Sequence, residues 1–254
     1  MTAPRLPKDF RLVEMDEVDS TNEEAKRLAG AGARDGTLIW AHGQTAGRGR
    51  RGREWVSERG NLFVSFVLRP DCAPLQAAQL TFVAALAVRD MLSAYMPGED
   101  DIQCKWPNDV LVRGRKISGI LLESSTAANG VVEWLVLGVG VNLRHHPDIG
   151  GRHAATSLVA EGAGEVAASS ALERLAHAFA ERRGQWLAGG FAAVRNAWLE
   201  HAYGLGQTAC IKLEGASHSG SFLGIDDSGA LRLKGDGCAE RLFAAGEVTF
   251  EESG

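Results

Sequence analysis

Arginine and glycine are concentrated in one short stretch of the chain. Residues 44–55 read QTAGRGRRGREW, and the segment 47–55, called here the arginine loop, holds four arginines, three glycines and one glutamate. Its local charge is +3, although the 254-residue chain has a formal net charge of −5. A guanidinium can bind phosphate or carboxylate through two parallel hydrogen bonds, and glycines let backbone N–H groups approach an anion closely. The composition predicts a loop that holds a phosphorylated ligand.

Two other interpretations of the arginine loop have to be weighed. Gly47, Gly49 and Gly52 fit the G-x-G-x-x-G pattern of dinucleotide-binding proteins, but that pattern requires a strand before it and a helix after it. Residues 61–68, which follow the loop, read as a strand, so a dinucleotide site is disfavoured. A solvated loop or a nucleic-acid-binding patch stays open on these residues alone.

A lysine and two alternating glycines form the next candidates. Lys105 opens the sequence KWPND within residues 102–123, which read as an antiparallel meander. A lysine in an apolar strand lies at a sheet edge in solvent or needs an anionic partner, and the rarity of buried lysine favours the edge. Gly138 and Gly140, in the strand 131–143 that also holds Asn142, clear one face of side chains. A flat ligand and a closely packed helix fit that face equally well.

Three small polar residues stand where a predicted strand at 10–15 meets a predicted helix that ends near residue 30. Thr21 and Glu24 have the spacing of a capping box, so a helix cap is the structural interpretation of Ser20, Thr21 and Asn22. Because a cap needs only one of these side chains, the others are available to a polar ligand. A short strand at 37–41 then leads to Gln44.

The remaining pattern predicts mixed α and β structure followed by a small β unit. One long helix with an apolar stripe that includes Leu75 is expected at 74–96, with a polar loop at 144–155. After residue 204 the segments become short and alternating, which predicts a small β-barrel. Two further helices are expected at 167–187 and 191–201, and strands at 61–69, 208–213, 219–225, 230–234 and 247–251. The domains are expected to span 1–204 and 205–254.

Composition limits the classes of protein that the chain can be. A hydrophobic content of 45% supplies a sizeable core. No apolar run approaches the roughly 20 residues that cross a bilayer, and residues 1–7 lack a signal-peptide pattern. The four cysteines form no C-x-x-C pair, so neither a disulfide framework nor a zinc site is expected. A sequence pI near 5.8 argues against general nucleic-acid binding. We therefore expect a cytoplasmic protein without a membrane segment.

The blocks described above, in this order and spacing, resemble a biotin protein ligase over nearly the whole chain. They are Ser20-Thr21-Asn22, residues 44–55, KWPND at 105–109 and GVGVN at 138–142. The resemblance implies an α/β (α+β) fold, with a mixed-sheet catalytic domain of the biotin/lipoate ligase type and a C-terminal SH3-like β-barrel. It also implies a two-step reaction. Biotin and ATP give biotinyl-5′-AMP, and a lysine of a biotin carboxyl carrier protein then displaces AMP.

The resemblance also implies residue roles. Lys105 and Arg50 are expected to be catalytic, and Lys105 would contact the reacting carboxylate and α-phosphate, which reverses the edge-strand preference. Trp55 is expected to anchor the loop by packing, and little apolar surface holds the loop in place without a ligand. The implied biotin-binding residues are Ser20, Thr21, Asn22, Gln44, Arg48, Gly49, Arg50 and Lys105. The implied ATP- and adenylate-binding residues are Gly47, Arg48, Arg50, Arg51, Trp55, Lys105, Gly140 and Asn142. No protein ligand set for a metal is implied.

The implied ligands and partners are biotin, ATP with Mg²⁺, and the carrier domain of a carboxylase. Some members of the family carry an N-terminal winged helix-turn-helix and repress transcription. Here the first catalytic strand is expected near residue 10, so a ligase without specific DNA binding is predicted. Exposed strand edges around residues 102–123 could pair with a second copy, giving a homodimer, or with the carrier.

Two rival functions remain open. The first is a lipoate or octanoate ligase or transferase on the same fold. A thioester-using transferase would need a nucleophilic cysteine, and Cys104, next to Lys105, would point to the opposite face of its strand. The second is an RNA-binding module, which would need a basic, aromatic-rich barrel face. The C-terminal segment is mixed in charge, and its aromatic residues are Phe222, Phe243 and Phe250.

Overall fold

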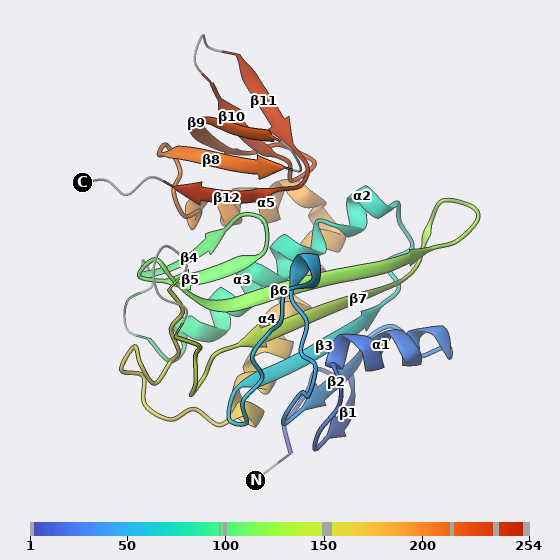
Figure 1. Ribbon diagram of the computed structural model, residues 1–254. Coiled ribbons are helices and arrows are strands. Elements are labelled where there is room, and N and C mark those ends of the chain that lie inside the picture. The colour runs from blue at the N-terminus through green and yellow to red at the C-terminus, as the bar shows by residue number, and fades with distance from the viewer. Residues whose placement is uncertain are drawn as a thin grey trace.

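A mixed seven-stranded sheet forms the larger part of the molecule (Figure 1). The computed structural model describes residues 3–96, 98, 101–148, 154–213, 216–235 and 239–250. In spatial order the strands are β1 (Arg11–Met15), β2 (Thr37–Ala41), β3 (Leu62–Leu68), β7 (Val132–Val141), β6 (Arg115–Thr126), β5 (Asp109–Val112) and β4 (Ile102–Lys105). β1 and β2 pair in parallel and every other neighbouring pair is antiparallel. The predicted mixed sheet is confirmed.

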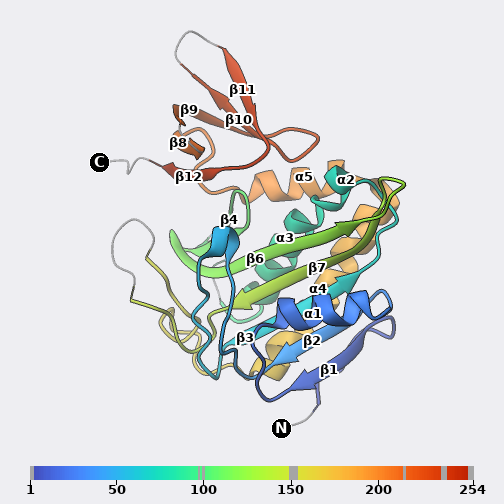
Figure 2. The same ribbon diagram turned by 45° about the vertical axis from the view of Figure 1, so that its right-hand side comes forward.

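Helices cover both faces of this sheet (Figure 2). Alanines of α1 (Thr21–Gly30) pack with Ile39, Val67 and Val136 in a small core on one face. The other face carries the main core, in which Phe66 of β3 and Phe179 have ring centroids 4.6 Å apart. The helices on that side are α3 (Leu80–Ser93), α4 (Ala168–Gly189) and α5 (Phe191–Glu200). β3 is buried along its whole length because it is covered on both faces.

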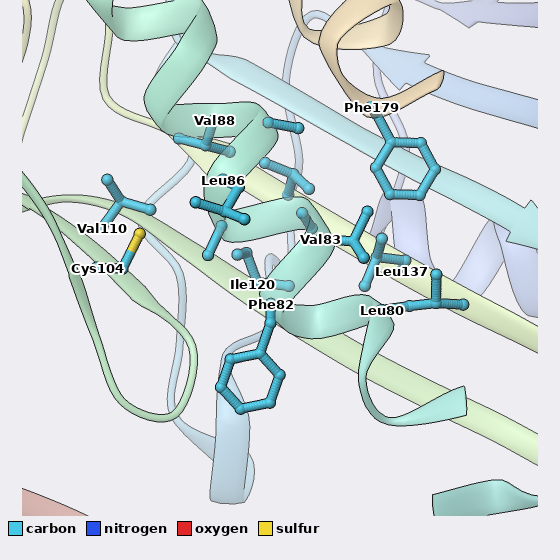
Figure 3. Close-up of a cluster of buried hydrophobic side chains, with 14 of the residues drawn as sticks. Leu80, Phe82, Val83, Leu86, Val88, Cys104, Val110, Ile120, Leu137 and Phe179 are labelled. Carbon is cyan, nitrogen blue, oxygen red and sulfur yellow. The ribbon is translucent and has the colours of Figure 1, made fainter. Parts of the chain in front are cut away.

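The long helix expected at 74–96 is two helices, α2 (Pro74–Ala77) and α3. Between them the hydrogen bonds change to the i→i−3 pattern, as in Gln79 N to Gln76 O at 3.1 Å and Phe82 N to Gln79 O at 3.0 Å. The apolar stripe was predicted correctly along α3, whose Leu80, Val83 and Leu86 lie in the main core (Figure 3). The prediction that Leu75 belongs to this buried stripe is wrong, since its side chain lies on α2 and is 62% exposed.

The expectation that no apolar run has the length of a membrane span was also too simple. By length and composition alone, the helical residues Pro74–Ser93 could cross a bilayer, since their mean hydropathy reaches 1.2. In the structure, however, 67% of this apolar stretch is buried inside the protein. Most of these residues belong to α3, which is a core helix packed between the sheet and its neighbouring helices (Figure 3).

The C-terminal part folds into a five-stranded antiparallel sheet, in agreement with the small β domain that was predicted. The segment at Glu240–Phe243 was missed, because ERLF between a glycine-rich stretch and Ala244-Ala245-Gly246 is too short for an alternating pattern. Of the predicted last strand, Glu251 lies outside the described residues, as do residues 149–153 of the predicted polar loop. The spatial order is β11 (Glu240–Phe243), β10 (Leu231–Lys234), β9 (Ala216–Ile225), β8 (Thr208–Leu213) and β12 (Glu247–Phe250).

The outer edge of β4 is covered by the chain that enters the C-terminal sheet. Cys104 donates its N–H to His201 O at 2.8 Å and accepts from Tyr203 N at 2.9 Å. The predicted exposed edge around residues 102–123 is therefore wrong, since β5 and β6 are interior strands. Contacts such as Trp106 Nε1 to Gly229 O, at 3.1 Å, hold the C-terminal sheet beside the larger one. This arrangement brings β12 close to the arginine loop.

Candidate functional site

A cavity of about 470 Å³ lies where the arginine loop, the β4–β5 turn, strands β6 and β7, and β12 meet. Figure 2 shows the loop, in blue, rising beside β6 towards the C-terminal sheet. The structure brings together residues from four separate sequence blocks at this one place. The predicted site residues that line the cavity are Ser20, Thr21, Asn22, Gln44, Arg48, Gly49, Arg50, Arg51, Trp55, Lys105, Gly140 and Asn142. The remaining one, Gly47, does not line the cavity; it begins the loop at a position where a Cβ would collide with Ser57 and Trp55 O.

The arginine loop is a short hairpin. At its base Trp55 N donates to Gly47 O at 3.0 Å, and further along Gly49 N donates to Arg53 O at 2.7 Å. The turn is made by Arg51 at φ 56° and Gly52 at φ 72°, in the left-handed region that glycine adopts most readily. Arg48 pairs with Glu23 of α1. The hairpin thus presents its arginines around the cavity while few backbone bonds hold it.

One end of the cavity is lined by uncharged polar side chains, and a carboxylate outside the lining is bonded to one of them. The buried Ser65 hydroxyl of β3 lies 2.6 Å from Asn22 Oδ1 and 2.8 Å from Thr21 Oγ1. Asn22 Nδ2 donates to Glu123 Oε2 at 3.0 Å. Burial opposes ionisation of Glu123, but hydrogen bonds from Asn22 and Lys26 outweigh it and lower its pKa. Such fixed donors and acceptors suit a neutral polar ring, because each group has a set direction.

The predicted capping box is wrong. The helix α1 begins at Thr21, its N-cap is Ser20, and no side chain caps it. The Thr21 N–H and hydroxyl instead donate to Gln44 Oε1 at 2.7 and 3.1 Å. Gln44 Nε2 in turn donates to Ser57 Oγ at 2.8 Å. These polar groups therefore face the cavity rather than serving the helix end.

Two half-buried cations stand at the other end of the cavity. Lys105 ends β4 directly opposite Asp109 of β5. Burial lowers the pKa of the Lys105 ammonium, although Asp109 partly offsets this. Burial also lowers the pKa of Arg50, whose Nη1 donates to Asn108 Oδ1 at 3.0 Å. A cation that has lost water is stabilised by an incoming anion, so this end suits phosphate or carboxylate.

The glycine-cleared face of β7 is closely packed, by a side chain of the neighbouring helix α1 at one glycine and by the arginine loop at the other. Asn22 lies against Gly138, and the indole of Trp55 lies against Gly140, where a Cβ would come within 2.5 Å of the ring. Gly119 faces Gly140 across the β6–β7 pair and touches the same ring. The indole Nε1 is buried with no hydrogen-bond partner among the residues that the structure describes. Trp55 therefore anchors the loop by packing, as predicted, on a surface cleared by two glycines.

Several cavity residues were missed in the sequence. Lys116 Nζ lies 2.7 Å from Asp109 Oδ1 and 5.4 Å from the centre of the Trp55 ring. Asn108 was taken as a turn residue, yet it orients Arg50 and its own Nδ2 is held by Ile120 O at 2.7 Å. Glu247 of β12 lines the cavity from another sheet, and no sequence signal linked it to the loop. Asn142 was found, and its amide donates to Thr156 O at 3.0 Å.

Cys104 takes no part in the site. It is fully buried on the side of β4 that faces the main core and does not line the cavity. Burial raises the pKa of its thiol to about 12, so the thiolate needed for nucleophilic attack is disfavoured. The opposite orientation of Cys104 and Lys105, predicted from strand alternation, is confirmed.

Comparison with known families matches both parts of the chain. The model of the biotin/lipoate A/B protein ligase family matches residues 15–142, and that of the biotin protein ligase C-terminal domain matches residues 204–250. The first match includes the polar end, the arginine loop, and the lysine and glycine blocks of the cavity. The second match includes β12, which contributes Glu247.

Individual relatives agree with these matches. A biotin--[acetyl-CoA-carboxylase] ligase of Paracoccus denitrificans is 45% identical, over 91% of this chain and 97% of that protein. The bifunctional ligase/repressor BirA of Bacillus subtilis is 33% identical, over 92% of this chain and 72% of that protein. The structure of a biotin protein ligase from Aquifex aeolicus in complex with biotin and ATP superposes with a TM-score of 0.81, at 28% identity, over 96% of this chain and 99% of that chain. The present chain therefore belongs to the biotin/lipoate A/B protein ligase family and, within it, to the biotin protein ligases.

Proposed function

We propose that this protein activates biotin with ATP as biotinyl-5′-AMP and transfers the biotinyl group to a lysine of a biotin carboxyl carrier protein. The observation that carries the proposal is one cavity with a fixed polar end around Gln44 and a cationic end around Lys105 and Arg50. A ligand with a neutral polar ring and an anionic chain end matches both. The relative from P. denitrificans bears the name of this activity, and the structure from A. aeolicus is described as a complex with biotin and ATP.

In the first step a carboxylate oxygen of biotin attacks the α-phosphorus of ATP, and pyrophosphate leaves. Both reactants are anions, so their approach is opposed by Coulomb repulsion unless fixed cations compensate it. We assign that compensation to Lys105 and Arg50, because burial has removed much of their hydration. Gln44, Thr21 and Asn22 would hold the ring end while this happens. The remaining predicted biotin and adenylate contacts, Ser20, Arg48, Gly49, Gly47, Arg51, Trp55, Gly140 and Asn142, are part of the same proposal.

In the second step the neutral amine of the acceptor lysine attacks the carbonyl carbon of the mixed anhydride. The bond from that carbon to the phosphate oxygen breaks, AMP leaves, and the amine loses a proton. The Arg50 guanidinium would stabilise the departing phosphate. A closed arginine loop would shield the anhydride from water until the acceptor arrives.

We further propose that Mg²⁺ enters with ATP. Within the described ranges, no group of three or more His, Cys, Asp or Glu residues could hold a metal ion. Mg²⁺ in nucleotide sites commonly uses substrate phosphates, waters and one or two carboxylates. Asp109 and Glu247 are carboxylates in the cavity lining and would serve that purpose. When bound, the ion would neutralise phosphate charge.

The rival functions have less support. A thioester-using transferase would need a nucleophilic cysteine in the cavity, and none of the cysteines that the structure describes, Cys72, Cys104 and Cys210, lines it. For an RNA-binding module, aromatic rings should be exposed on the C-terminal sheet. Phe222 and Phe243 are buried, and Phe250 packs edge-on against Tyr203. These rings form the interior of the C-terminal part rather than a stacking surface.

Several expectations about the whole protein belong to the same proposal. We place the domain boundary at 1–204 and 205–254, supported by the start of the C-terminal family match at residue 204. We propose a cytoplasmic location, supported by the free state of Cys72, Cys104 and Cys210; Cys238 lies outside the described residues. A lack of specific DNA and membrane binding, and a homodimer, stay predictions.

Mass spectrometry tests the proposal directly. The purified protein is incubated with Mg-ATP and, in separate reactions, with biotin, lipoate or octanoate, and the acyl-adenylate is sought. Biotinyl-AMP alone is the expected product, followed by modification of one lysine when a carrier domain is added. Lipoyl- or octanoyl-AMP would change the substrate, and no adenylate with any acid would overturn the proposal.

A further inference from the structure

A continuous chain of hydrogen bonds joins the polar end of the cavity to the base of the arginine loop. It starts at the buried Ser65 hydroxyl, 2.8 Å from Thr21 Oγ1. Thr21 donates to Gln44 Oε1 at 2.7 Å through its N–H, and Gln44 Nε2 donates to Ser57 Oγ at 2.8 Å. Ser57 donates its hydroxyl hydrogen to Trp55 O at 2.8 Å. Ser57 is therefore the residue that connects the polar end of the cavity to the arginine loop.

The donors and acceptors in this chain leave little freedom. A serine hydroxyl has one hydrogen, and Ser57 gives it to Trp55 O, so Ser57 can only accept in its contact with Gln44. The orientation of the Gln44 amide is set in turn, because its oxygen faces two Thr21 donors and its nitrogen faces Ser57. Turning the amide over would break bonds at both ends.

The residue that Ser57 holds is the closing residue of the hairpin. Trp55 N donates to Gly47 O across the hairpin base, and the Trp55 indole packs on Gly119 and Gly140. Ser57 thus fixes the carbonyl side of a residue whose amide side closes the loop. Gly47 lies directly behind Ser57 and Gln44, where a Cβ would leave no room. This chain of hydrogen bonds is therefore also held in place by close packing.

We propose that Ser57 is a positioning residue that couples occupancy of the biotin end to closure of the arginine loop. The inference rests on the proposed function, since it takes biotin as the ligand of the Gln44 end. A cyclic urea that hydrogen-bonds to Thr21 and Gln44 restrains the Gln44 amide, and the Ser57 hydroxyl passes that restraint to the Trp55 carbonyl. Without the hydroxyl, Gln44 Nε2 and Trp55 O both lose a partner, and binding at one end no longer restrains the loop.

Trypsin provides a direct readout, because the loop contains four arginines, Arg48, Arg50, Arg51 and Arg53. Native-state cleavage reports how often a segment opens. Wild type, Ser57→Ala and Ser57→Thr are each saturated with biotin, as judged from their own binding curves, and cleavage in the loop is timed. Wild type and Ser57→Thr are expected to be protected by biotin. In Ser57→Ala the factor by which biotin slows cleavage is expected to be about fivefold smaller, which is the effect of one ordinary hydrogen bond.

Ser125→Ala is the matched control. Its hydroxyl donates to Glu133 at 3.3 Å on the exposed part of β6, away from the cavity, so protection should match the wild type. Should Ser57→Ala fail to fold, Ser57→Thr and Ser57→Val give the same comparison, since they have similar shape and differ in the hydroxyl. Equal protection of the variants with and without the hydroxyl, or no protection of the wild type, would overturn the inference. Biotinyl-AMP formation by the wild type would leave the proposed function intact in either case.

Discussion

Arg53 of the arginine loop and Glu247 of β12 form an ion pair, with Nη2 2.5 Å from Oε2, between residues 194 positions apart in the sequence. The C-terminal sheet therefore supplies a carboxylate to the cavity and restrains the loop that covers it. Glu247 also acts at longer range on the cationic end, where its charge opposes the burial effect on the pKa of Arg50 and Lys105. The C-terminal part therefore contributes to the cavity lining and to the position of the loop, and is not only an appendage to the larger sheet.

Replacement of Glu247 by glutamine should loosen the loop in the absence of ligand. Arg53 loses its charged partner, and an ion pair as exposed as this one contributes about 0–1 kcal/mol, so loop cleavage by trypsin should rise by a few fold. The thermal midpoint should change little. Glu240→Gln is the matched control, because Glu240 pairs with Arg232 within the C-terminal sheet at 2.7 Å and is remote from the loop. Equal cleavage of Glu247→Gln and wild type would contradict this role.

Replacement of Lys105 by alanine should abolish adenylation without unfolding the protein. Loss of one preorganised charge at a reacting phosphate typically costs about 100- to 1,000-fold in rate. Stability should hardly fall, since the folded protein no longer carries a partly buried ammonium. Biotin-dependent pyrophosphate release measures the rate, and thermal melting measures stability. The exposed Lys212, changed to alanine, should leave both unchanged, and normal turnover of Lys105→Ala would remove the assignment.

The rate of adenylation should fall at alkaline pH earlier than an ordinary lysine would allow. Burial lowers the pKa of Lys105 below its usual 10.5, so the ammonium is present below that lowered pKa and is lost as the pH rises through it. The catalytically useful form is the charged one. Pyrophosphate release measured across the alkaline range should decline with a midpoint below pH 10.5. An arginine stays charged across this range, so the activity that Lys105→Arg retains should show no such decline. A shared decline in both proteins would assign the titration to another group.

Local patterns predicted much of this site because its residues come in compact blocks. The strand at 37–41 has the predicted limits, and the arginine loop was found from its charge and glycine content. Lys105 was assigned to the site only through the family resemblance, because its position in the strand alone favoured a sheet edge. What the sequence could not show depends on contacts between blocks. Thr21 looked like a helix cap, because nothing local reveals that its N–H and hydroxyl donate to Gln44. Glu247 became visible only when β12 was placed beside the loop.

The Arg50→Ala variant should fold normally and release its adenylate. Arg50 reaches the cavity from the hairpin and is held by Asn108, so its removal deletes a charge at the phosphate end while the hairpin bonds remain. The variant is loaded with biotin and Mg-ATP and passed through a desalting column, and the biotinyl-AMP that stays bound is measured. Wild type should retain it and Arg50→Ala should not. Unchanged retention in a correctly folded variant would count against the closing role.

Gly140→Ala should displace Trp55 from the floor of the cavity. A Cβ at this position would lie 2.5 and 2.6 Å from two indole atoms, closer than atoms can pack, whereas the strand backbone itself accepts alanine. The indole must move, so the tryptophan fluorescence should change and adenylate retention should fall, with a smaller effect on the binding of biotin alone. Gly184→Ala in α4 is the control, because a Cβ there meets nothing within 4 Å. Unchanged fluorescence and retention in Gly140→Ala would show that the site does not depend on this contact between Trp55 and β7.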